Sequence, residues 1–79
     1  MLLSDAVKER IKYFLDKKEM TLWDLYKSSG VPKATIYAFM NSNKENLVKL
    51  DTLLHLCEGL GISIKKFFDD PIFEDVEQD

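Results

Sequence analysis

The sequence predicts an all-α fold, a five-helix orthogonal bundle. Apolar residues recur at three- and four-residue steps along nearly the whole chain, which is the spacing of amphipathic helices. No stretch keeps the alternation of apolar and polar residues that a half-buried strand requires. With 79 residues, of which 46% are hydrophobic, the chain has the size and composition of one small folded domain.

The first two predicted helices each follow a residue that can cap a helix. Ser4 is expected to cap a helix over about 5–18. Its apolar face is formed by Val7, Ile11, Phe14 and Leu15. Thr21 is expected to cap a second helix that ends near Ser29. The inward residues of that helix are Leu22 and Leu25. Gly30 can adopt the left-handed conformation that ends this helix and turns the chain.

A third helix is predicted over 32–41. Pro32 stands in its first turn, where the missing N–H of proline is tolerated. Its inner stripe is formed by Ile36, Phe39 and Met40. The polar residues at 41–46 have the composition of a loop.

A leucine-rich fourth helix and a short fifth helix complete the bundle. The apolar positions of the fourth helix are Leu50, Leu53, Leu54, Cys57 and Leu60. Gly59 and Gly61 are expected to end it. Ser63 caps the fifth helix and Pro71 stops it. The residues that fold back toward the core are Ile64, Phe67 and Phe68.

Charge divides the chain into two parts. Residues 69–79 hold six acidic residues and no basic one, which leaves 11 basic against 8 acidic residues in the first 68. We therefore expect a mildly basic helix-turn-helix domain over 1–69 and an acidic C-terminal tail over 70–79. A basic body is compatible with a nucleic-acid partner although the net charge of the chain is −3.

Several protein classes are excluded by composition. The chain has one cysteine, so it cannot form an intrachain disulfide, which fits a reducing compartment. It has no signal peptide and no apolar run near the roughly 20 residues of a membrane span, so a cytoplasmic location without membrane contact is expected. No nucleophile–base pair, metal-ligand cluster or glycine-rich phosphate loop is present. We therefore expect no enzyme activity, no cofactor and no metal.

The second and third helices form the candidate site. Only about three residues around Gly30 separate them, and so short a connection forces the steep crossing of a helix-turn-helix. The outer face of the third helix then carries a single charge, and its residues are Lys33, Ala34, Tyr37, Ala38 and Asn41. A helix face with so little charge is expected to lie against a partner.

The residue types on this face suit duplex DNA. Lys33 can donate to guanine N7 or O6 or to a phosphate, and Tyr37 can donate to a phosphate or pack on a thymine methyl. The small side chains of Ala34 and Ala38 allow close approach to a groove wall. Contacts with the DNA backbone are expected from polar groups at helix starts and in the following loop, namely Thr21, Thr35, Ser42, Asn43 and Lys44.

The stretch "MTLWDLYKSSGVPKATIYAFMN", followed by "LDTLLHLCEGLGISIKKFF", resembles the Cro/lambda-repressor (XRE-type) family of helix-turn-helix proteins. The resemblance covers about 7–68 and includes the positions Thr21, Leu25, Gly30, Val31, Thr35 and Ile36. It implies that the third helix enters the major groove, so that its outer residues lie near base edges and the loop at 41–44 lies near phosphates. It also implies a homodimer that binds a palindromic operator in double-stranded DNA.

The chain departs from the family pattern at several positions. Leu22 stands where many members have a glutamine that contacts the DNA backbone, and Tyr26 stands where many have a small alanine. Met40, Asn41 and Ser42 replace a common Glu-x-Gly pattern. The outer face also lacks arginine and glutamine, so sequence readout is expected to be modest or to depend on DNA shape.

The function predicted is a sequence-specific transcriptional regulator, expected to be a repressor. A protein-interaction module, such as an antitoxin-like or regulatory partner, stays open, because the acidic tail mixes Ile72, Phe73 and Val76 with acids. For Trp23, we expect that the ring covers the first helix, with a contact to a partner or to the DNA backbone as the alternative.

Overall fold

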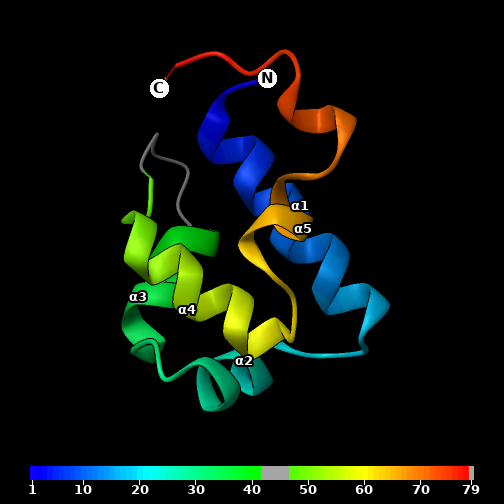
Figure 1. The fold of residues 1–79 in the computed structure, drawn as a ribbon. Helices are drawn as coiled ribbons and strands as arrows, with labels where there is room; N and C mark the ends of the chain where they lie inside the picture. The colour runs from blue at the N-terminus through cyan, green and yellow to red at the C-terminus, as the bar shows by residue number, and fades with distance from the viewer. Residues whose placement is uncertain (42–46, 79) are drawn as a thin grey trace.

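The computed structural model describes residues 1–41 and 47–78, and the predicted all-α, five-helix fold is confirmed (Figure 1). In chain order the elements are α1 (Leu3–Lys17), α2 (Leu22–Ser29), α3 (Lys33–Asn41), α4 (Leu50–Leu60), α5 (Ile64–Phe68) and the 3-10 turn η1 (Pro71–Phe73). No β-strand forms within the described ranges, where a single isolated bridge joins Leu2 and Glu77. No helix of the described chain has the length and apolarity needed to cross a membrane.

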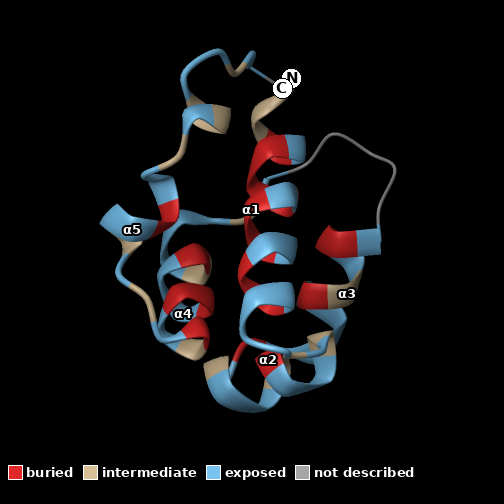
Figure 2. Cartoon of the chain, turned by 90° about the vertical axis from the view of Figure 1, so that its right-hand side faces the viewer, coloured by how far each residue is buried: buried red, intermediate tan, exposed pale blue. Residues whose placement is uncertain are grey.

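All five helices contribute to one core. Figure 2 shows the buried positions on the sides of the helices that face one another. The largest of the fully buried side chains are Phe14, Phe67, Ile11, Leu25, Ile36 and Leu60. The inner stripe of α3 and the inward residue Leu25 of α2 are therefore where the periodicity predicted them.

The inward face of α4 differs from the prediction. Leu56 is buried, whereas Leu54 is exposed and Leu50 is 71% exposed, so the buried stripe is rotated away from these two leucines. Gly59 lies inside the helix and does not end it. A Cβ on Gly59 would lie 2.7 Å from the Cβ of Ser29, so this glycine lets α4 approach the end of α2 closely. Gly61 ends the helix with a left-handed φ of 72°, as predicted.

The start of α1 also differs from the prediction. Ser4 is buried inside the helix, and Leu2 occupies the position before its first turn without a side-chain cap. The chain's other end replaces the expected cap, because the N–H of Leu3 donates to the carbonyl of Glu77 at 2.9 Å. The N–H of Glu77 donates in turn to the carbonyl of Met1 at 2.9 Å, so the two termini lie side by side (Figure 1).

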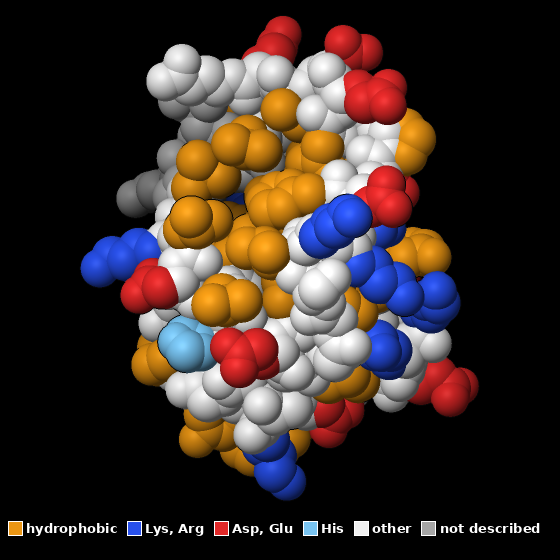
Figure 3. All heavy atoms as spheres, in the orientation of Figure 1, with side chains coloured by type: hydrophobic (Ala, Val, Ile, Leu, Met, Phe, Trp, Pro, Cys, Tyr) orange, Lys and Arg blue, Asp and Glu red, His pale blue; other side chains and the backbone are white. Residues whose placement is uncertain are grey.

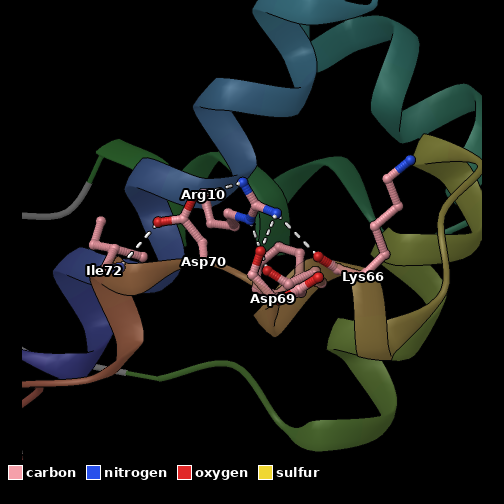
Figure 4. Close-up of polar contacts among 6 residues, drawn as sticks. Arg10, Lys66, Asp69, Asp70 and Ile72 are labelled. Atoms are coloured by element: carbon pink, nitrogen blue, oxygen red, sulfur yellow. Dashed lines mark hydrogen bonds and ion pairs between the residues drawn. The ribbon is translucent and has the colours of Figure 1, made fainter.

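Arg10 joins α1 to the segment that follows α5 (Figure 4). Its Nε donates to the carbonyl of Phe67 at 2.7 Å, and its Nη2 donates to the carbonyls of Lys66 at 3.0 Å and Asp69 at 3.3 Å. Its Nη1 forms an ion pair with Asp70 Oδ2 at 3.2 Å. The side chain is 8% exposed, so a buried cation at this junction is held by four hydrogen bonds, one of which is also an ion pair.

The C-terminal segment folds back onto α1 and α5. Asp70 Oδ1 accepts a hydrogen bond from the N–H of Ile72 at 2.9 Å and so caps η1. The ring of Phe73 lies 4.9 Å from that of Phe68 and 6.0 Å from that of Phe67, measured between centroids. The ring of Phe73 thus serves contacts within the chain itself.

Candidate functional site

The first helix of the candidate site begins at a capping box. The hydroxyl oxygen of Thr21 accepts a hydrogen bond from the N–H of Asp24 at 3.1 Å, and Asp24 Oδ2 accepts one from the N–H of Thr21 at 2.9 Å. The backbone N–H of Thr21, and next its side chain, lower the pKa of Asp24 by stabilising the carboxylate. The cap predicted at Thr21 is confirmed, and it fixes the exposed start of α2.

A three-residue turn separates α2 from α3. Gly30 has a φ of 74°, which is the left-handed conformation predicted for it, and its N–H donates to the carbonyl of Tyr26 at 3.2 Å. Val31 is buried, and its N–H donates to Ser29 Oγ at 3.1 Å. Because the turn is anchored by a buried side chain and by hydrogen bonds, it holds the two helices in a defined relation.

The third helix starts directly after Pro32. The carbonyl of Pro32 accepts hydrogen bonds from the N–H groups of Thr35 at 3.0 Å and Ile36 at 3.2 Å. Proline therefore stands one residue before the helix begins at Lys33, where its fixed φ suits a helix start.

The outer face of α3 is directed away from the core. The exposed members of the predicted site are Thr21, Lys33, Ala34, Thr35, Ala38 and Asn41, and Tyr37 is half-buried. The predicted residues Ser42, Asn43 and Lys44 lie outside the described residues. The structure thus brings one exposed, lightly charged surface together from the start of α2 and the outer side of α3.

Trp23 borders this surface, on the side of the molecule that the alternative expectation for it required. The residue is 46% exposed, and the Nζ of Lys33 lies 5.0 Å from the centroid of the indole ring. The same Nζ lies 5.8 Å from the ring of Tyr37. The ring of Tyr26 braces Trp23 from within α2, with the two centroids 5.2 Å apart. These ring contacts join Trp23 to α3. The expected cover of the first helix by this ring stays a prediction. No local pattern could have paired residues ten positions apart on two helices.

A shallow groove separates α3 from the start of α4. It is lined by Thr35, Ala38, Phe39, Leu47, Val48, Lys49 and Thr52. Lys49 is exposed at the position before α4, so it places a second cation beside the outer face of α3. Lys49 is not among the predicted contacts, although a lysine directly before the leucine-rich helix is a signal that the sequence contains.

Charge is distributed unevenly over the molecule. Lys27 is exposed in the last turn of α2, so it adds to the cations near the site. The acidic C-terminal segment lies at the opposite end of the molecule from α2 in both ribbon views (Figures 1 and 2). The acidic groups that make the net charge negative are therefore kept away from the start of the candidate surface.

A different surface covers α4 and α5. Figure 3 shows apolar side chains gathered across this face. The exposed large apolar residues there are Leu47, Leu50, Leu54 and Phe68. Contiguous apolar surface of this kind marks a contact site more often than a solvated one.

Nothing in the described chain is arranged for catalysis by a thiol or a metal. Burial raises the pKa of the Cys57 thiol to about 11, so the group is protonated at neutral pH and is a poor nucleophile. Among residues 1–41 and 47–78, no group of three or more His, Cys, Asp or Glu side chains can hold a metal ion.

One of three comparisons with known proteins found a match, and it agrees with this geometry. A family model described as Cro/C1-type HTH DNA-binding domain matches residues 10–71, a range that contains α2, α3 and α4 complete. Neither the comparison with curated proteins nor that with solved structures found a match.

Proposed function

We propose that this chain, which belongs to the Cro/C1-type helix-turn-helix DNA-binding family, is a sequence-specific transcriptional repressor. The observation that carries the proposal is the two-sided character of α3. Its inner residues Ile36 and Phe39 are buried, while its outer residue Lys33 is exposed beside small side chains. A helix that is held firmly on one side and carries little charge on the other can enter a major groove.

The proposed contacts divide into base readout and backbone positioning. Lys33 donates to a guanine edge or a phosphate, Tyr37 contacts a thymine methyl or a phosphate, and Ala34 and Ala38 allow close approach. Backbone positioning is assigned to Thr21, Thr35, Asn41, Ser42, Asn43 and Lys44. Because the outer face offers few bidentate groups, we expect that sequence-dependent DNA shape contributes to specificity.

We further propose that the protein acts in the cytoplasm as a homodimer on a palindromic operator. Half-sites one helical turn apart, about 34 Å, require two copies of α3 related by a two-fold axis. The exposed apolar residues Leu47, Leu50, Leu54 and Phe68 support a self-association surface on α4 and α5. A dimer that covers an operator excludes other proteins from it, which is the simplest mechanism of repression.

The first test is selection of bound duplexes from a random DNA pool, which we expect to enrich an inverted repeat. On that repeat, Lys33→Ala combined with Tyr37→Ala should weaken binding at least about thirtyfold, because both proposed base-edge contacts are lost. Binding of the unaltered protein should also weaken steeply with salt, as phosphate contacts require. Fluorescence anisotropy measures both, and circular dichroism checks that the variant is folded.

The chain offers a matched control for this double substitution. Lys17 lies 5.7 Å from the ring of Tyr13 on α1, almost the distance of 5.8 Å between Lys33 and Tyr37. Lys17→Ala combined with Tyr13→Ala removes the same two residue types at the same spacing and should leave operator affinity unchanged. Full binding by the Lys33 and Tyr37 variant would show that another surface contacts DNA.

Of the apolar residues of the tail, Phe73 packs against Phe67 and Phe68. The protein-interaction alternative rests on this acidic tail and on the weakly basic outer face of α3. It stays a prediction, as do a protein partner for the acidic segment and the absence of enzyme activity.

A further inference from the structure

We propose that Trp23 is a positioning residue that holds the ammonium group of Lys33 in place for DNA. The inference rests on the proposed function and adds to it a residue that lies outside the predicted contact set. Trp23 acts in this proposal through Lys33, and the indole itself makes no required contact with the duplex.

The geometry shows a cation held between two helices. The Nζ of Lys33 lies 5.0 Å from the ring of Trp23 on α2 and 5.8 Å from the ring of Tyr37 one turn further along α3. Trp23 is supported in turn by Tyr26, whose ring lies 5.2 Å away at 52°. The side chain of Lys33 is therefore directed toward α2 by contacts that cross the turn.

The ammonium group has capacity for a further partner. Within the described ranges, 1–41 and 47–78, Lys33 takes part in no hydrogen bond and no ion pair, and its side chain is exposed. Rings that attract a cation through their faces leave its N–H groups to donate elsewhere. A phosphate or guanine acceptor can thus be bound while the ring contacts persist.

Two physical effects make the rings favour the bound state. A lysine side chain has a flexible four-carbon stem, and contacts that already restrict it reduce the entropy lost when it binds an acceptor. Cation–π attraction also strengthens when water is excluded, as it is when a duplex covers the surface. Both effects predict that DNA affinity depends on Trp23 only while Lys33 is present.

A double-mutant cycle with Trp23→Leu and Lys33→Met tests this dependence on the selected operator. Trp23→Leu should weaken binding about fivefold in the presence of Lys33 and have no effect in the Lys33→Met background. Trp23→Phe keeps an aromatic face and should restore most of the affinity. The same cycle with Tyr13→Leu and Lys17→Met is the control and should leave affinity unchanged.

Each other outcome has a distinct meaning. An equal loss in both Lys33 backgrounds would mean that Trp23 contacts DNA directly, and tighter binding by Trp23→Leu would mean that the ring competes with DNA; either overturns the proposal. Failure of the unaltered protein to bind any duplex would instead overturn the proposed function. A readout without DNA completes the test, because the Hε protons of Lys33 should show a ring-current shift that Trp23→Leu abolishes. If the Hε protons of Lys33 show no ring-current shift in the unaltered protein, the proposal is also overturned.

Discussion

Arg10 and Lys33 both lie against two aromatic rings, but their polar surroundings are opposite. The guanidinium carbon of Arg10 lies 4.9 Å from the ring of Tyr13 and 4.5 Å from that of Phe14. Every guanidinium nitrogen of Arg10 also donates to a carbonyl or to a carboxylate of α5 or of the two residues that follow it (Figure 4). Because the side chain is 8% exposed and its hydrogen bonds are all made within the chain, this cation is not available to a partner outside it.

Lys33 also lies near two aromatic rings, but no hydrogen-bond acceptor is found for it in the described part of the chain. It is exposed between Trp23 and Tyr37. An aromatic neighbour therefore does not determine whether a cation stabilises the fold or binds a ligand. A buried cation that is hydrogen-bonded within the chain stabilises the fold, whereas an exposed one with unused donors suits an anionic ligand.

Arg10→Met is expected to have the largest effect, and it tests the assignment of Arg10 to fold stability. The substitution leaves three backbone carbonyls and Asp70 without their buried donor, so the free energy of unfolding should fall by about 3 kcal/mol. Urea denaturation measures it, with Lys12→Met on the exposed side of α1 as a control that should change stability by less than about 0.5 kcal/mol. DNA affinity per folded molecule should stay the same. A variant with normal stability and weak DNA binding would reverse the roles assigned to the two cations.

Gly59→Ala tests whether the close packing of α4 on the end of α2 positions the surface that contains Lys33. The added Cβ would lie 2.7 Å from the Cβ of Ser29 and 2.9 Å from its Cα, so α2 must shift away from α4. We expect a loss of about 2 kcal/mol in the free energy of unfolding and, in contrast to Arg10→Met, a loss of DNA affinity.

Gly30→Ala is the matched control for that substitution, because Gly30 has open space around its Cβ position. Its cost arises only from the left-handed φ of 74° and should be about 1 kcal/mol. Equal effects of the two alanines on stability and DNA affinity would mean that the close approach of α4 to Ser29 is unimportant.

The two cations also differ in how far the sequence predicts their surroundings. Local signals predicted the elements around Lys33, because the cap at Thr21, the left-handed Gly30 and the buried stripe of α3 each depend on neighbours within a few residues. The exposure of the outer face of α3 follows from the same periodicity. The contact between Lys33 and Trp23 crosses two helices, and only the helix crossing determines it.

Nothing local predicts the surroundings of Arg10. Its partners are 56 to 60 residues away in sequence, and its position on α1 resembles that of an ordinary surface charge. Long-range contacts also explain two predictions that were wrong. The carbonyl of Glu77 takes the place of a cap by Ser4, and the close packing of Gly59 on Ser29 explains a glycine that seemed to end α4. Periodicity identifies faces and ends of helices, but not the distant segment that satisfies or contacts them.

The smallest change in stability is expected from the capping box at the start of α2, the helix that carries Trp23. Thr21→Ala should lower the free energy of unfolding by about 1 kcal/mol at pH 7, whereas Thr21→Ser keeps the hydroxyl and should change it little. Asp24 adds a pH dependence. Folding lowers the pKa of Asp24, so its contribution is complete above the unfolded pKa of about 3.9 and is lost as the pH falls further.

Urea titrations of the unaltered protein and Asp24→Asn, made between pH 7 and pH 2, measure this pH dependence. The stability difference between the two proteins should be constant near neutral pH and shrink below about pH 4, because the ionised carboxylate accepts the N–H of Thr21 more strongly than a neutral amide or a protonated acid does. Arg10→Met should remain less stable than the parent across the same range down to about pH 4, since its three lost carbonyl contacts do not titrate. A difference for Asp24→Asn that persists unchanged to pH 2 would mean that the cap depends on the shape of the side chain and not on its charge.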